Sequence, residues 1–185
     1  MRHHPKRRLN DVGTATLALG MLFLPWAVPH TVTSLAGVPT STVSRGQTES
    51  LPAEQGKKIT LDAPAGWQRS PRTTKNTVTY TEGQRTLTVT VLTGAKDQRT
   101  AFDRHVRASS LKGTLFQLEG QKFTTKNGFD GIHCSVSTRG TNQRGNCAMS
   151  TKGEALVVVS SLSERGSEPF DINPLLVSLA VKDPK

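Results

Sequence analysis

A few residues in this 185-residue chain have types and spacing that acyl-transfer chemistry requires. His105 lies between Asp103 and Ser110, an order that would set a base between an acid and a nucleophile. On a helix, however, residues two apart do not face each other, so Asp103 cannot orient His105. The chain also lacks a Gly-x-Ser-x-Gly segment, the turn that exposes a nucleophilic serine. We therefore predict no catalytic residue.

Metal and cofactor chemistry has no clear motif in the sequence either. His105 and His133 are far apart, and neither has a neighbour at metal-ligand spacing. No glycine-rich phosphate-binding loop is present. The acidic residues form no obvious pair for glycoside hydrolysis, although distant positions can supply such pairs. We predict no metal, no cofactor and no enzymatic activity, with a small envelope hydrolase as an alternative.

Cys134 and Cys147 are the two cysteines of the chain. Each lies in a run that alternates apolar and polar residues, and residues 139–145 between them are rich in turn formers. In a hairpin, Cys134 would lie opposite Cys147 and Ile132 opposite Met149. We predict a structural disulfide, with free buried thiols as the alternative. The pair lacks the Cys-x-x-Cys spacing of redox-active thiols.

Basic residues outnumber acidic ones, 24 to 14, giving a formal net charge of +10. Outside a membrane, a basic domain is attracted to anionic lipids or anionic wall polymers. Arg104, Arg107 and Lys112 belong to a predicted helix at 99–112 and could form a basic contact surface; a solvated helix face is the alternative. The basic residues are scattered and no nucleic-acid module is visible, so no nucleic-acid partner is predicted.

The N-terminal residues have the layout of an export signal. Basic residues precede an uncharged apolar run at 12–28, and Ser34-Leu35-Ala36 offers a small-x-small cleavage site. Cleavage after Ala36 would release a secreted domain. Retention would leave a single transmembrane helix in the plasma membrane, with the C-terminal domain outside the cytoplasm. Both outcomes predict an extracytoplasmic location.

The chain divides into three predicted parts. Residues 1–36 form the signal peptide or signal anchor. Residues 37–56 are rich in Ser, Thr, Gly and Pro and are predicted to be a disordered linker. Residues 57–185 form the exported domain, which is long enough to build its own core.

Alternating patterns predict mostly strands in this domain, with two helices. The continuous β-branched run at 155–161 is typical of a central strand covered on both faces. Thr100 is the predicted cap of the first helix, and Asn173-Pro174 the cap and first residue of the last helix. Together these predict an α+β fold: an antiparallel sheet with flanking helices, preceded by an apolar helix and a linker. The other strands are predicted at 59–63, 77–80, 87–91, 115–123 and in the cysteine hairpin.

The order of elements resembles the PsbP-like fold, named for an extrinsic subunit of photosystem II. The matching features are a strand running into Pro64-Ala65-Gly66-Trp67, a helix near 99–112, and a last helix with Phe170 before it and Leu175-Leu176 and Leu179 along it. Within that fold, an apolar segment, a polar linker and a small domain are similar to the C-terminal half of actinobacterial type VII secretion-associated proteins. This resemblance implies a membrane protein with an extracytoplasmic domain and transfers no catalytic residue.

The sequence therefore predicts an envelope protein with a non-catalytic interaction domain, which contacts a protein partner such as the type VII export machinery. The alternative is a binding module for an anionic or apolar envelope component.

Overall fold

The computed structural model describes residues 40–71, 74–93 and 97–184, which belong to one unit spanning Pro39–Lys185. Its elements are, in order, β1 (Ser41–Thr42), β2 (Thr48–Pro52), η1 (Glu54–Gly56), β3 (Lys58–Asp62), β4 (Gln68–Arg69), β5 (Thr77–Glu82), β6 (Arg85–Leu92), α2 (Gln98–Leu111), β7 (Thr114–Thr124), β8 (Asp130–Thr138), β9 (Arg144–Lys152), β10 (Ala155–Ser163), α3 (Asn173–Ser178) and β11 (Ala180–Lys182).

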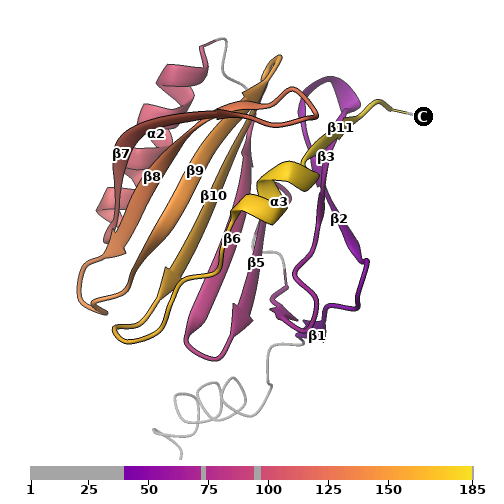
Figure 1. The fold of residues 1–185 in the computed structure, drawn as a ribbon. Helices are drawn as coiled ribbons and strands as arrows, with labels where there is room; N and C mark the ends of the chain where they lie inside the picture. The colour runs from indigo at the N-terminus through magenta and orange to yellow at the C-terminus, as the bar shows by residue number, and fades with distance from the viewer. Residues whose placement is uncertain (1–39, 72–73, 94–96, 185) are drawn as a thin grey trace, which may run out of the picture. The chain divides into compact units, whose positions relative to one another are not determined.

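The strands form two antiparallel sheets. The large sheet has eight strands in the order β1-β4-β5-β6-β10-β9-β8-β7, and the small sheet has three in the order β11-β3-β2. In Figure 1 the large sheet lies between α2 on one face and α3 with the small sheet on the other. The predicted fold class, α+β with an antiparallel sheet and flanking helices, is confirmed.

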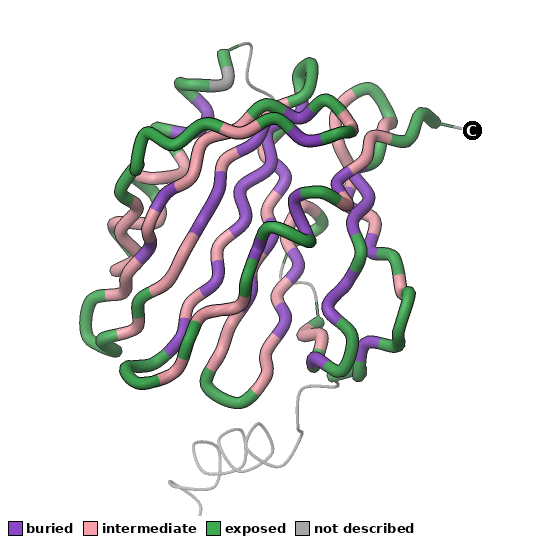
Figure 2. Tube along the Cα trace, in the orientation of Figure 1, coloured by how far each residue is buried: buried purple, intermediate pink, exposed green. Residues whose placement is uncertain are grey.

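Strand β10 shows why its sequence is apolar at consecutive positions. Val157 and Val159 belong to the main core with α3, whereas Leu156 and Val158 pack against Phe102 of α2. Successive side chains of a strand point to opposite faces of the sheet. Where both faces are covered, as at β10, side chains at consecutive positions are buried and therefore apolar. The buried positions in Figure 2 accordingly concentrate on the middle strands of the sheet. The prediction for residues 155–161 is confirmed.

The predicted disordered linker at 37–56 is wrong for the part that the structure describes. Strand β2 pairs with β3 over its full length, and Leu51 is completely buried. Val43, which follows β1, is also buried. Threonine and serine are compatible with strands. From composition alone, the entropy cost of ordering this segment was expected to exceed what its few apolar residues gain by burial. Pairing with β3 and burial of alternate side chains offset that cost.

The two helices are where predicted, but each begins differently. The Asp97 side chain accepts hydrogen bonds from the backbone N–H groups of Arg99 and Thr100, and from the Thr100 hydroxyl at 2.5 Å. Asp97, and not Thr100, therefore caps α2. The Thr100 hydroxyl and these N–H groups hold the pKa of Asp97 below its usual value. In α3 the capping position is Ile172, one residue before the prediction, and Asp171 accepts from the Asn173 N–H.

The predicted signal or anchor at 1–36, including the apolar run at 12–28, lies outside the described residues. Within the described ranges, none of the helices combines the length and apolar character needed to cross a bilayer.

Candidate functional site

The two cysteines form the predicted disulfide. Cys134 of β8 and Cys147 of β9 are directly paired in register, and their sulfurs are bonded. Ile132 lies opposite Met149, as the alternation predicted. Both cysteines are buried, so this disulfide has a structural role in holding the hairpin.

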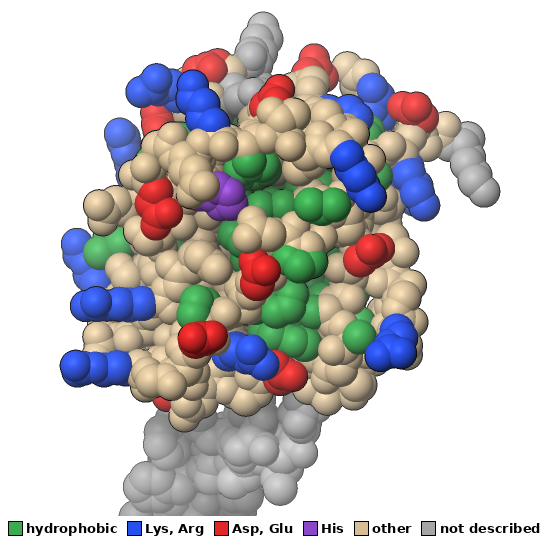
Figure 3. Space-filling view, in the orientation of Figure 1, with side chains coloured by type: hydrophobic (Ala, Val, Ile, Leu, Met, Phe, Trp, Pro, Cys, Tyr) green, Lys and Arg blue, Asp and Glu red, His purple; other side chains and the backbone are tan. Residues whose placement is uncertain are grey.

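The three residues of the predicted basic contact surface lie on or beside α2. Arg104 and Arg107 are exposed, and Lys112 is the exposed C-cap residue. Leu111, the last residue of the helix, is 86% exposed. The Arg139 backbone N–H donates to the Gly113 carbonyl at 2.7 Å, which brings a fourth cationic residue to the same end. Figure 3 shows Lys and Arg side chains gathered along the edge of the domain where α2 and β7 lie.

His105 and His133, the histidines of the described residues, do not converge with acidic side chains. His105 lies on the inner side of α2, with its ring 5.7 Å from that of Phe116. Burial, and secondarily the charge of Lys112, lowers the pKa of His105. The His133 ring lies against that of Phe123, with the ring centroids 4.7 Å apart and the planes tilted by 45°. Among the described residues, no group of three or more His, Cys, Asp or Glu side chains is arranged to hold a metal.

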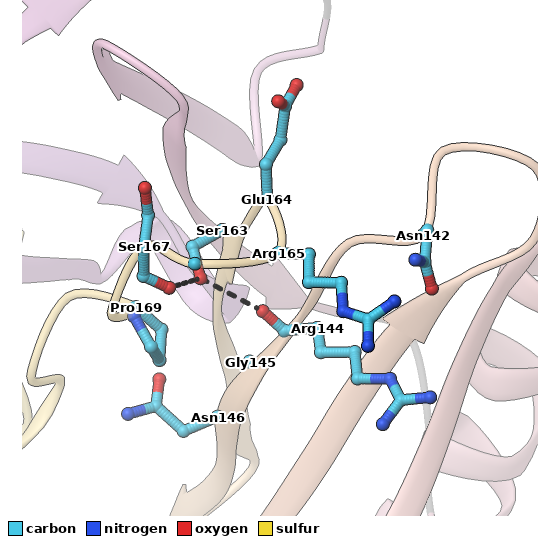
Figure 4. Close-up of a pocket in the computed structure, with 10 residues that line it drawn as sticks. Asn142, Arg144, Gly145, Asn146, Ser163, Glu164, Arg165, Ser167 and Pro169 are labelled. Carbon is cyan, nitrogen blue, oxygen red and sulfur yellow. Dashed lines mark hydrogen bonds between the residues drawn. The ribbon is translucent and has the colours of Figure 1, made fainter.

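A pocket of about 550 Å³ lies at the end of β9 and β10, where the sequence indicated no site. Arg144 at the start of β9 and Arg165 in the β10–α3 connection both line it. Figure 4 shows the two guanidinium groups extending to the same side of the pocket, with that of Arg165 nearer to Asn142 in this view. Ser163, Ser167, Asn146 and Pro169 line the opposite part of the pocket.

Backbone structure fixes the positions of both arginines. Arg144 pairs with Ser163 in the β9–β10 register. Next to it, Gly145 approaches β10 so closely that a Cβ atom would lie 1.8 Å from the Ser161 carbonyl oxygen, so only glycine fits. Arg165 lies in a turn in which the Ser167 N–H donates to the Glu164 carbonyl at 3.1 Å. Gly166 has a φ of +96° in that turn, a conformation that favours glycine.

Side-chain hydrogen bonds also hold the turn to the strand. The Ser163 hydroxyl donates to the Ser167 carbonyl at 2.7 Å and lies 3.3 Å from the Arg144 carbonyl. These contacts connect the turn that carries Arg165 to the strand that carries Arg144.

The charges in this pocket are not balanced by the protein residues that line it. Glu164 is the acidic residue among them, and Figure 4 shows its side chain directed away from both guanidinium groups. No ion pair joins Arg144 or Arg165 to an acidic residue of the described ranges. Two guanidinium groups in one pocket repel each other, and an anion between them would relieve that repulsion.

Arg69, a partly buried arginine, has the opposite environment. Arg69 of β4 donates from Nε to Glu49 Oε2 at 2.6 Å and from Nη2 to Oε1 at 3.4 Å, and the buried Tyr80 hydroxyl donates to Oε2 at 3.2 Å. The hydrogen bond to Glu49 raises the pKa of Arg69. This group connects β2 of the small sheet to β4 and β5 of the large sheet.

Sequence reasoning missed the pocket because its arginines are 21 positions apart and belong to different connections. One local signal was present: Arg45, Arg139, Arg144 and Arg165 each precede a glycine. Arginine beside a turn glycine marks a charged loop end, but only the strand register shows which two of the four share a pocket.

No protein-family model matches this sequence, and no curated protein matches it. Among solved structures, the chain is similar to the solution structure of a cyanobacterial PsbP from Synechocystis. The identity is 12%, the TM-score is 0.43, and the match covers 70% of this chain and 87% of that chain. This similarity concerns the arrangement of the chain alone, and the association with type VII secretion stays a prediction.

Proposed function

We propose that this chain is a non-catalytic binding domain of the cell envelope, secreted or held at the membrane by its N-terminal segment, that docks on an anionic surface through α2. The observation that carries the proposal is Leu111, 86% exposed at the end of a helix that also presents Arg104, Arg107 and Lys112. A single exposed leucine is ordinary. A leucine among cations, however, matches the chemistry of an anionic lipid surface, which attracts the charges and accepts the apolar side chain.

The expected binding energies require several residues of α2 to contact the membrane together, since each one contributes little. A basic residue close to an anionic membrane contributes about 1 kcal/mol to the binding free energy. This attraction decays with distance from the surface over about one Debye length. Arg104 and Arg107 together therefore account for about 30-fold in affinity. Because the attraction is electrostatic, binding should weaken strongly with added salt.

Co-sedimentation with vesicles of phosphatidylglycerol and phosphatidylcholine tests this proposal. Arg104→Gln/Arg107→Gln should reduce the vesicle affinity about 30-fold, and Leu111→Ser should reduce it further. The matched control is Arg45→Gln/Lys58→Gln, which removes the same charge from exposed positions outside α2. Equal losses in both double variants would show that net charge alone is responsible and would contradict docking through α2.

A second candidate function is supported by the edge of the large sheet. Strand β7 has 11 residues and pairs with β8 on one side only. Its other edge can accept an added strand from a protein partner. An accessory role in type VII secretion, the finer prediction from the family resemblance, would use a contact of this kind.

Site-specific photo-crosslinking in membranes tests this second candidate. A crosslinking residue at Gln117 in β7 should capture a component of the export machinery, whereas one at Gln84 in the β5–β6 turn should not. Identical products at both positions, or none at Gln117, would contradict pairing at β7.

A further inference from the structure

We propose that the pocket between Arg144 and Arg165 is a binding site for a phosphate group carried on a polyol or sugar. This site is separate from the α2 surface and does not depend on the proposed docking function. The residues that form it belong to the β8–β9 turn, the start of β9 and the β10–α3 connection.

The charge of the pocket favours an anion as its ligand. Arginine stays protonated at every physiological pH, so both guanidinium groups are cationic. Neither has an acidic partner in the described residues, and the lining carboxylate of Glu164 is directed away. Both arginines are exposed and can be solvated in the free protein, and an anion that contacts both would in addition offset their mutual repulsion.

The donor geometry favours phosphate over carboxylate. Each guanidinium presents a planar fork of N–H donors, and one fork takes the two paired lone pairs of a carboxylate, leaving one outer lone pair on each oxygen. A phosphate has further oxygens, so it can accept from two forks at once. Asn142 also lines the pocket, and its amide NH2 group is a further donor available to a ligand.

The rest of the pocket fits a polar group attached to the phosphate. Its volume of about 550 Å³ is within the range of pockets for whole small molecules, far more than a bare ion fills. Ser163, Ser167 and Asn146 line the end away from the arginines. The buried Asn146 Oδ1 has no hydrogen-bond donor in the structure, and a ligand hydroxyl would supply one after a small side-chain adjustment.

The site is also held in place before a ligand arrives. Arg144 is fixed by the β9–β10 register, and the Arg165 turn is bonded to the strand through Ser163. Asn142 adopts a φ of +53°, which asparagine tolerates, at the end of the β8–β9 turn. The backbone of the site therefore needs little ordering on binding, and the cost that remains is that of the two exposed arginine side chains.

Isothermal titration with sn-glycerol 3-phosphate, inorganic phosphate and acetate tests the proposal. Arg144→Gln and Arg165→Gln should each weaken glycerol phosphate binding by about 10-fold to 100-fold. Arg144→Lys and Arg165→Lys keep the charge but lose the fork, and should weaken it by a smaller factor. The matched control is Arg139→Gln, an exposed arginine of the same hairpin turn that does not line the pocket. Circular dichroism and urea unfolding of each variant verify that the fold is retained.

Three outcomes would overturn the site: no saturable binding of glycerol phosphate, an equal loss in Arg139→Gln, or acetate binding as tight as phosphate. Saturable binding lost in both pocket variants supports it. Vesicles containing phosphatidylglycerol then distinguish the source of the phosphate: if Arg165→Gln weakens vesicle binding but soluble glycerol phosphate competes poorly, the ligand is a lipid headgroup.

The Arg104→Gln/Arg107→Gln variant separates this inference from the proposed docking function. It should bind soluble glycerol phosphate like the wild type even where its vesicle binding is lost. Failure of the α2 proposal therefore leaves the pocket proposal standing, and the reverse also holds.

Discussion

The arginine side chain has two opposite environments in this domain, one at Arg69 and the other at Arg144 and Arg165. Arg69 is held by Glu49 and Tyr80 between the two sheets, and its charge is neutralised within the protein. Arg144 and Arg165 share a pocket at the domain end with no acidic partner in the described chain. The first arrangement connects parts of the fold, whereas the second leaves cationic donors available to a ligand. Charge compensation, more than residue type, separates a structural arginine from a binding one.

The Glu49→Ala variant tests the structural role of Arg69 and should have the largest effect. It would remove the carboxylate that accepts from Arg69 and from the Tyr80 hydroxyl between the sheets. Removing one partner of a buried pair costs about 3 to 5 kcal/mol. Because the Arg69 side chain is 21% exposed, we expect the low end, about 3 kcal/mol in the free energy of unfolding. Urea unfolding measures this, with the exposed Glu168→Ala as control. A loss below about 1 kcal/mol would mean that the buried group does not hold the sheets together.

The disulfide supplies a stabilisation of comparable size in the strands that lead to the pocket. Cys134 and Cys147 are 13 positions apart, and closing a loop of that length stabilises by about 3 kcal/mol in the chain-entropy model. Cys134→Ala/Cys147→Ala should therefore lower the free energy of unfolding by about that amount. If the pocket is held by strand register, glycerol phosphate binding should persist in this variant below its unfolding transition. Mass spectrometry before and after reduction, a difference of about 2 Da, verifies the bond in the wild type.

The open arginines should contribute almost nothing to stability. Arg144→Gln and Arg165→Gln remove mutual repulsion and expose no unpaired acid, so the free energy of unfolding should stay within about 0.5 kcal/mol of wild type. A destabilisation like that of Glu49→Ala would mean that these arginines have a structural partner, and the comparison would then fail.

His105 extends the comparison to a partly buried group that can lose its charge. Without an acidic partner, burial lowers its pKa, so the unfolded state binds more protons in the interval between the two pKa values. The corresponding stability is present above the unfolded value, near pH 6.5, and is lost as the pH falls through the lowered folded value. We expect a smaller acid-dependent loss of stability in His105→Gln than in wild type, measured by urea unfolding between pH 7.5 and 5. Parallel pH profiles for the two proteins would contradict this, and His133→Gln provides the histidine control.

Local patterns predicted those parts of the fold that depend on neighbours along the chain. Alternation placed Leu87, Val89 and Val91 on one face of β6, and these residues are buried while the intervening threonines pair with β5. The same alternation put Cys134 opposite Cys147. Turn residues between strands and the apolar run at 155–161 were sufficient for the hairpins and the central strand. The predicted linker failed because β2 has few apolar residues and is a strand only through its pairing with β3.

The sequence by itself determined the order of elements from β5 to α3, the disulfide register and the basic character of α2, because each follows from side-chain period, turn chemistry or charge within a short segment. The tertiary structure alone decided that Glu49 would neutralise Arg69 and that Arg144 and Arg165 would share a pocket. Those relations join residues about 20 positions apart on different elements, and no local period specifies them. Their geometry depends on how β9, β10 and the two sheets pack, which the free energy of the whole fold determines.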